Sequence, residues 1–149
     1  MLARFIVIPG MAAPLRGPVT MSMPFSPDSA GRVRQALGSW LDHRGSAEDV
    51  VADVRLVATE LVGNAVRHAR PLGNGTVLVR WHEEDLEKGS VLELSVCDGG
   101  GGGGGPERLE AAPTDVGGRG LAIVDALSST WWVEHSGPLH TVHARVALD

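Results

Sequence analysis

The feature that most constrains the fold is a long amphipathic stretch, residues 46–70. Ser46 and Asp49 resemble a capping box with Asp in place of the usual Glu, and Pro71 and Gly73 end the stretch. Apolar side chains recur along it at helical spacing, at Val50, Val51, Val54, Val57, Leu61, Ala65 and Val66. The stretch therefore predicts a long helix whose apolar face packs against another layer of the domain.

The order of the other segments predicts the kind of layer. The expected strands are residues 20–25, 74–81, 90–98, 130–135 and 140–148, and the expected helices are residues 26–45, 46–70 and 118–129. The charged residues 82–89 read as the solvated tip of a hairpin, and a second hairpin turns around Gly137. Two clusters of strands with helices between them favour an α+β fold: a two-layer sandwich with helices on one face of a mostly antiparallel sheet.

Length and composition limit the classes of protein to be considered. A chain of 149 residues with 43% hydrophobic residues predicts one domain, residues 20–149, and we expect residues 1–19 to be a poorly ordered extension rather than a signal peptide. The net charge of −5 does not suggest a nucleic-acid surface, and no stretch has the roughly 18 apolar residues that span a bilayer. The lone Cys97 fits a buried, reduced thiol in a cytoplasmic protein.

Glu60 and Asn64 are the first candidate functional pair. They lie one helical turn apart, so both project from the same face of the predicted helix. This face is either a solvated polar face or a site for a hydrated metal nucleotide, in which an amide oxygen binds Mg²⁺ and a carboxylate accepts a proton. Because Lys88 is the only lysine of the chain, a lysine-dependent P-loop is excluded.

The run of glycines after Asp98 is the second candidate feature. It could be a tether between domains or the floor of a site, because an aspartate at a strand end can either form a turn or accept a hydrogen bond from an exocyclic amino group. Gly117, Gly118 and Gly120 precede an apolar helix, where exposed backbone N–H groups favour phosphate. His140 and His143 are three apart on a predicted strand and do not suggest a chelating pair.

In order and spacing, "ELVGNAVRHA", "VCDGGG", "GRGLAIV" and "HTVHARV" resemble the conserved boxes of the GHKL ATPases, which have the Bergerat fold. The resemblance covers residues 20–149 and is strongest to the anti-sigma-factor serine kinases. It implies that Glu60 is a general base and that Asn64 binds Mg²⁺. It implies that Asp98 binds the adenine amino group and that Thr141 supports adenine recognition through water. The other implied ATP-binding residues are His68, Gly100, Gly102, Gly118, Arg119, Gly120 and Leu121.

The resemblance also implies a function. We expect an ATP- and Mg²⁺-dependent serine/threonine-protein kinase that phosphorylates a STAS-type anti-sigma-factor antagonist, sequesters a sigma factor and regulates transcription by partner switching. A homodimer is one assembly that the resemblance allows. The alternatives are a nucleotide-binding partner switch without kinase activity and an interaction domain that binds no nucleotide. The nearly all-glycine loop departs from the family, and we expect it to start a lid, residues 103–117, that is mobile without nucleotide.

Overall fold

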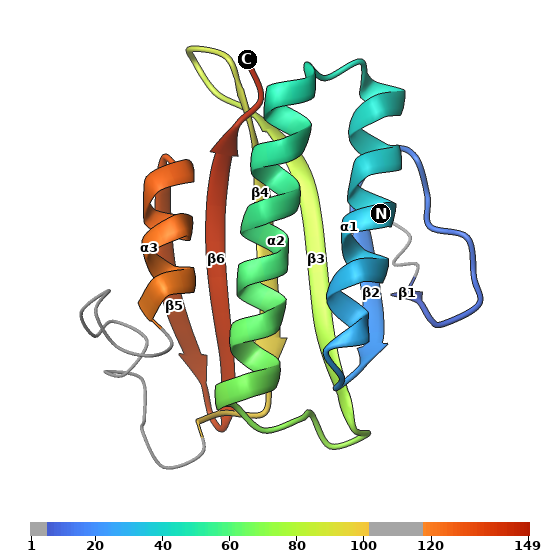
Figure 1. Cartoon of the computed structure of the whole chain (residues 1–149), viewed down its shortest axis with the longest axis vertical. Helices are drawn as coiled ribbons and strands as arrows, with labels where there is room; N and C mark the ends of the chain where they lie inside the picture. Colours follow the sequence, from blue (N-terminus) through green and yellow to red (C-terminus); the bar gives the residue numbers. More distant parts are fainter. Residues whose placement is uncertain (1–5, 102–117) are drawn as a thin grey trace.

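The computed structural model describes residues 6–101 and 118–149, and within them a single sheet carries helices on one face (Figure 1). The strands are β1 (Ile6–Val7), β2 (Val19–Pro24), β3 (Thr76–Asp85), β4 (Ser90–Asp98), β5 (Thr130–Ser136) and β6 (Leu139–Ala147). The helices are α1 (Asp28–Arg44), α2 (Glu48–His68) and α3 (Gly118–Leu127). The predicted α+β sandwich is confirmed. None of these helices is both long enough and apolar enough to cross a bilayer.

The order of the strands in the sheet is β1-β2-β3-β4-β6-β5. Only the β1–β2 pair is parallel, and the other neighbouring strands are antiparallel. β3 and β4 form the first predicted hairpin and β5 and β6 the second, with β6 placed next to β4. This order brings the end of β4 beside the start of β6, where Asp98 lies opposite His140.

The N-terminal segment contains an element that the sequence did not predict. Ile6 and Val7 pair with Thr20 and Met21 of β2, and Val7 is only 2% exposed. The pairing places Val7 in the same apolar core as Met21, which gives this segment a reason to be ordered. Two residues are too few to produce a periodic pattern, so a strand of this length leaves no signal in the sequence.

The first predicted hairpin has a shorter tip than expected, because β3 continues through residues 82–85. These charged side chains find partners across the strands. His82 pairs with Glu93 in the register, and Arg145 of β6 donates to the carboxylates of Glu93 at 3.0 Å and Glu84 at 3.4 Å. Cross-strand ion pairs on the helix-free face thus stabilise a strand whose composition suggested a solvated loop.

The predicted capping box of α2 is wrong. The N-cap residue is Ala47, which makes no side-chain cap hydrogen bond, so Ser46 lies one position too early. The Ser46 hydroxyl accepts a hydrogen bond from Arg44 at 3.4 Å instead, and the Asp49 carboxylate accepts one from the N–H of Val50 at 3.0 Å. The predicted end of α1 is confirmed, since Gly45 has a φ of 84° and closes the helix in the left-handed conformation.

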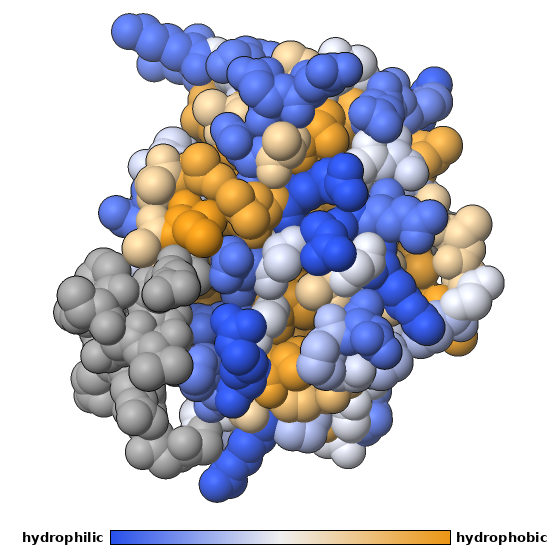
Figure 2. Space-filling view, viewed as in Figure 1, coloured by the Kyte–Doolittle hydropathy of each residue, from blue (hydrophilic) through white to orange (hydrophobic). Residues whose placement is uncertain are grey.

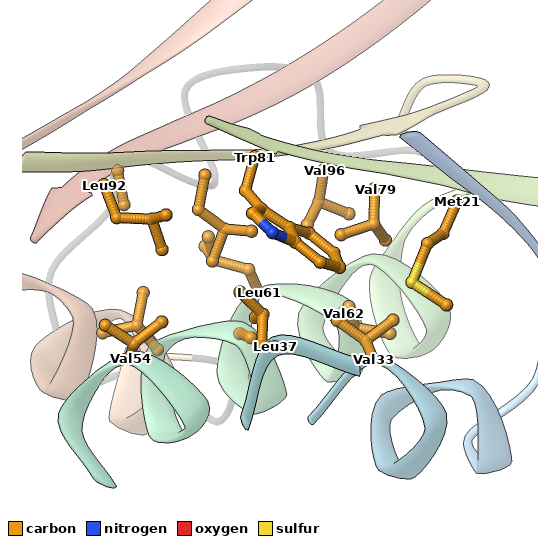
Figure 3. Close-up of a cluster of buried hydrophobic side chains, with 14 of the residues drawn as sticks. Met21, Val33, Leu37, Val54, Leu61, Val62, Val79, Trp81, Leu92 and Val96 are labelled. Carbon is orange, nitrogen blue, oxygen red and sulfur yellow. The ribbon is translucent and has the colours of Figure 1, made fainter. Parts of the chain in front are cut away.

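The core lies between the sheet and the helices, and Trp81 of β3 is its largest fully buried side chain. Figure 3 shows Trp81 extending from the sheet toward Leu37 of α1 and Leu61 of α2. Leu37 is fully buried and Leu61 is 2% exposed. The predicted apolar stripe of α2 therefore packs on the sheet, and this packing fixes which face of α2 is left for other groups.

The helix-covered side of the molecule is not uniformly polar. Figure 2 shows apolar residues gathered over α3 and mostly hydrophilic residues over the neighbouring part of α2. Ile123 and Leu127 of α3 are only half-buried. Because α3 packs against α2, the polar face of α2 is bordered by an apolar wall.

An ion-pair cluster joins the C-terminal end of α1 to the end of the sheet where β4 begins. Arg44 donates two hydrogen bonds to the carboxylate of Glu83, at 2.8 and 3.0 Å, and a third to the Ser90 hydroxyl at 2.9 Å. The carboxylate of Asp149 accepts hydrogen bonds from the backbone N–H and the hydroxyl of Ser90, at 2.8 and 2.9 Å. The hydrogen bonds from Arg44 hold the pKa of Glu83 below its ordinary value of 4.5.

This cluster predicts how stability changes in acid. A group with a lowered folded-state pKa contributes stability above its unfolded pKa and loses it as the pH falls through the folded pKa. We expect Glu83→Gln to lower the free energy of unfolding by about 0.5–1 kcal/mol at pH 7. The difference from the unsubstituted protein should shrink as the pH falls below 4.5, where that protein also loses the charge. Urea unfolding at pH 7 and pH 3 measures the loss of stability and its decrease in acid, with a substitution of an exposed residue, Glu87→Gln, as control. A difference that stays constant across this range would contradict the assignment.

Candidate functional site

Buried polar side chains gather at one end of the sheet. The buried polar or charged residues in the described part of the chain are Ser29, Asn64, Ser90, Asp98 and His140. Ser29 donates to the carbonyl of Pro24, and Ser90 belongs to the ion-pair cluster at the other end of β4. The remaining three belong to the last turns of α2, the end of β4 and the start of β6, which lie at the same end of the molecule (Figure 1).

The polar face of α2 is only partly solvated. Asn64 is 4% exposed, and its Oδ1 atom has no hydrogen-bond partner among the described residues. Glu60, one turn earlier, is half-buried, whereas Arg67 and His68 in the last turn are exposed. The interpretation as a solvated face thus fits the basic helix end, which suits the helix dipole, but it does not fit Asn64. A buried amide oxygen without a partner is costly, so it marks a place where a ligand can be held.

The carboxylate of Asp98 is buried and held at both oxygens. The side chain is 1% exposed. Its Oδ1 accepts a hydrogen bond from the N–H of Gly100 at 2.8 Å, and its Oδ2 lies 3.2 Å from Nδ1 of His140. The contact to Gly100 is the turn-forming role expected of an aspartate at a strand end. The contact to His140 leaves Asp98 fixed on the helix-covered face.

The first glycines after Asp98 are part of a bridge rather than a tether. The backbone of Arg70, just beyond α2, makes two hydrogen bonds to this loop. Its carbonyl accepts one from the N–H of Gly99 at 2.8 Å, and its N–H donates one to the carbonyl of Gly100 at 2.9 Å. Ala69 forms an isolated antiparallel bridge with Gly101. The end of α2 is thereby joined to the loop after β4, and the positions of Asn64 and Asp98 depend on one another.

Two of these glycines have no room for a side chain. A Cβ atom on Gly99 would overlap the carbonyl oxygen of Pro71. Gly100 has a φ of +105°, and a Cβ there would lie 2.6 Å from the carbonyl oxygen of Pro138. Close packing thus fixes the backbone at Gly100, which the resemblance implies as an ATP-binding residue, and at Gly99, which carried no prediction.

Helix α3 brings the predicted glycine-rich helix start beside α2. Gly118, Arg119 and Gly120 are its first residues, and α3 packs against α2. Leu121 is 5% exposed. Gly102 and the predicted lid, residues 103–117, lie outside the described residues.

The family model of the histidine kinase-like ATPase domain matches residues 23–145. The chain belongs to this family. A search of curated proteins finds no match.

Two solved structures resemble this histidine kinase-like ATPase domain. One contains the RsbU and RsbW domains of Rv1364c from Mycobacterium tuberculosis, with a TM-score of 0.63 and 22% identity over 88% of this chain. The chain spans only 32% of that protein chain. The other is the histidine kinase domain of a blue-light activated histidine kinase from Erythrobacter litoralis, with a TM-score of 0.48 and 20% identity, covering 84% of this chain and 61% of that one. At this identity, the first likeness shows that the fold is shared.

The register of β4 with β6 determines which way Thr141 of the ATPase domain faces. Thr141 pairs with Cys97, whereas Asp98 pairs with His140. Since side chains alternate along a strand, Thr141 faces the helix-free side of the sheet, away from the carboxylate of Asp98. The residue of β6 that lies beside Asp98 is His140. Strand alternation places His140 on the same face as the buried Val142, and the β4–β6 register shows that this face brings it to Asp98.

The residues of this ATPase domain fit ATP and Mg²⁺. Asn64 offers an unpaired, buried amide oxygen, which is the type of ligand that Mg²⁺ prefers. Asp98 offers a buried, fixed carboxylate that can accept a hydrogen bond from the adenine amino group. The amide oxygen of Asn64 and the carboxylate of Asp98 therefore match the metal and the amino group that a magnesium nucleotide presents.

Two other features of the ATPase domain lie away from these residues. A cavity of about 610 Å³ is lined mainly by the N-terminal segment and α1, including Val7, Met11 and Ala36. On the helix-free face, His82, Glu84 and Glu93 lie close enough to share a metal ion, but Arg145 already pairs with both carboxylates. His143 lies on the helix-free face, with Nε2 2.9 Å from Oε1 of Glu134, whereas His140 lies on the helix-covered face.

The bridge at the end of α2 gives a prediction about Gly99. We expect Gly99→Ala to lower the free energy of unfolding by about 1–3 kcal/mol, because the added methyl group meets backbone that cannot move aside freely. Gly73→Ala is the matched control, since a Cβ there meets nothing within 4 Å. Chemical unfolding of both variants checks the difference. If Gly99→Ala is as stable as Gly73→Ala, the bridge does not constrain the site.

Proposed function

We propose that this domain binds ATP with Mg²⁺ and transfers the γ-phosphate to a serine or threonine of a STAS-type anti-sigma-factor antagonist. The observation that carries the proposal is the buried, unpaired Oδ1 of Asn64, one turn from the half-buried Glu60. In a helix without other demands, these positions would hold apolar or fully exposed residues. A carboxylate and a ligand oxygen on the same face instead provide the two groups that phosphoryl transfer needs.

In the proposed reaction, Glu60 accepts the proton of the substrate hydroxyl. The hydroxyl oxygen forms a bond to the γ-phosphorus while the bond between that phosphorus and the β–γ bridging oxygen breaks, and ADP leaves with the electron pair. Bound Mg²⁺ supplies positive charge that offsets the negative charge developing on the phosphates. Asn64 is the side chain that would hold the metal, and Asp98 would hold the adenine ring through its amino group.

The first turn of α3 is proposed to bind the phosphates. Backbone N–H groups at a helix N-terminus are unpaired and carry the positive end of the helix dipole. Gly118 and Gly120 begin α3, and α3 packs against α2, the helix that carries Glu60 and Asn64. Arg119 is proposed to face either the phosphates or the partner protein.

The proposed partners are the antagonist and a sigma factor. This part rests on the resemblance of the sequence motifs to the anti-sigma-factor serine kinases and on the fold shared with the structure of the RsbU and RsbW domains of Rv1364c. Binding a sigma factor when the unphosphorylated antagonist is absent would make the domain a partner switch. The regulation of transcription would then be indirect, through the sigma factor and not through DNA.

The catalytic role of Glu60 gives a testable prediction. We expect Glu60→Gln to lower the rate of phosphate transfer to a STAS-type antagonist from the same organism by about 100-fold or more, because a general base contributes 10²–10⁴-fold. ATP affinity should change little, since the substitution keeps the size of the side chain. Transfer is measured with γ-labelled ATP and affinity by calorimetry, and Glu48→Gln in the exposed first turn of α2 serves as control.

The outcomes separate the alternatives. Full labelling of the antagonist by Glu60→Gln would contradict the proposed mechanism. Tight ATP binding by the unsubstituted protein without any transfer would favour a partner switch that binds nucleotide but has no kinase activity. Absence of ATP binding would contradict both and leave an interaction domain.

A further inference from the structure

We propose that the cavity between the N-terminal segment, residues 8–15, and α1 binds a small amphiphilic monocarboxylate, with the apolar chain inside and the anionic head at Arg32. This would be a second ligand site. It shares no residue with the group around Asn64 and Asp98, so the inference does not rest on the proposed binding of ATP.

The N-terminal segment is held at both ends. At its start, β1 pairs with β2. Beyond its other end, Nε1 of Trp40 on α1 donates a hydrogen bond to the carbonyl of Gly17 at 3.0 Å, and Nε of Arg16 donates one to Nε2 of His43 at 3.1 Å. Between these anchors the chain bows outward beside α1 (Figure 1). The cavity is therefore bounded by a segment whose two ends are fixed to the rest of the domain.

The cavity has a buried apolar floor and a half-exposed apolar rim. Met21 and Met23 of β2 line it and are 5% and 1% exposed. Ile8, Met11 and Leu15 of the N-terminal segment also line it, but they are 51%, 53% and 46% exposed. Large apolar side chains that stay exposed around a cavity gain free energy when a ligand removes them from water.

The size of the cavity suits a small molecule. Its volume of about 610 Å³ falls within the range of roughly 300–1,000 Å³ that is typical of sites for small ligands. Three of the four methionines of the chain line it. Methionine side chains are flexible and polarisable, so they adapt to the shape of an aliphatic chain.

The polar side chains of the cavity select the charge of the ligand. Arg32, Gln35 and Ser39 come from one face of α1, since they are spaced by three and four residues. Arg32 is the only charged residue, and no carboxylate occurs, among the described residues that line the cavity. An arginine can bind a carboxylate through two parallel hydrogen bonds, and a single cation matches a single negative charge. An ammonium or a neutral head group would leave this match unused.

Methyl NMR of the unsubstituted protein, labelled with ¹³C at the methionine methyl groups, tests the site directly. The probe is decanoate below its micelle concentration. We expect decanoate to shift the resonances of Met11, Met21 and Met23 with a common saturation curve, because all three line the cavity. Decanol, which has the same chain without the charge, should bind more weakly.

A substitution of Arg32 tests the contact with the head group. We expect Arg32→Gln to weaken decanoate binding by about tenfold, the change that accompanies loss of one hydrogen bond between charged groups. Binding of decanol should be unchanged, because the apolar lining is kept. Arg55→Gln is the matched control, since Arg55 is an exposed arginine on α2 that does not line the cavity.

Several outcomes would overturn the proposal. One is that decanoate leaves the three methionine resonances unmoved, and another is that Arg32→Gln keeps the preference for decanoate over decanol. If dilution of the protein alone shifts these resonances, the cavity is covered by a second copy of the chain. If anionic lipid vesicles shift them and monomeric decanoate does not, the surface binds membranes instead. Calorimetry with ATP on the same samples tests the proposed function separately.

Discussion

The site depends on the backbone bridge between the end of α2 and the loop after β4. The helix could pack its apolar stripe on the sheet at several positions along its axis, since apolar contacts have little directionality. The hydrogen bonds of Arg70 with Gly99 and Gly100 remove that freedom. They fix the end of α2 against the end of β4, and so fix Asn64 relative to Asp98. Glycine is required because the two backbones pass too closely for a side chain.

A second constraint is the register of β4 with β6. A shift of one residue would turn every side chain of β6 to the other face and expose Val142 and Ala144, so the apolar pattern fixes the register strongly. The same register decides that His140 and not Thr141 meets Asp98. The partner of the buried carboxylate is thus determined by core packing along the whole strand, and not by the chemistry at its end.

Much of this architecture could be predicted from the sequence, because each long element carries a periodic pattern. The stripe of α2, the two hairpins and the position of Gly45 follow from local preferences. The capping box of α2 failed locally, by one position, whereas the other failures depend on partners far away in sequence. The extension of β3 needs Arg145, the strand β1 needs β2, and the contact between Asp98 and His140 needs the register of two strands that are not consecutive. The motifs therefore located Asn64 and Asp98 but could not identify the residue beside Asp98.

The buried polar groups at this end of the sheet oppose folding unless something pairs them. Ser29 and Ser90, elsewhere in the fold, are fully engaged by the protein itself. Asn64 and His140 each keep an unpaired atom, although apolar residues at these positions would pack without that cost. The carboxylate of Asp98 is held in place by Gly100 and His140, yet a carboxylate has more acceptor sites than these two contacts use. Trp81 Nε1, Ser128 Oγ and His143 Nδ1 are also buried without a partner among the described residues, but only at this end of the sheet do such atoms accompany a buried carboxylate. That combination is expected where a polar ligand completes the structure.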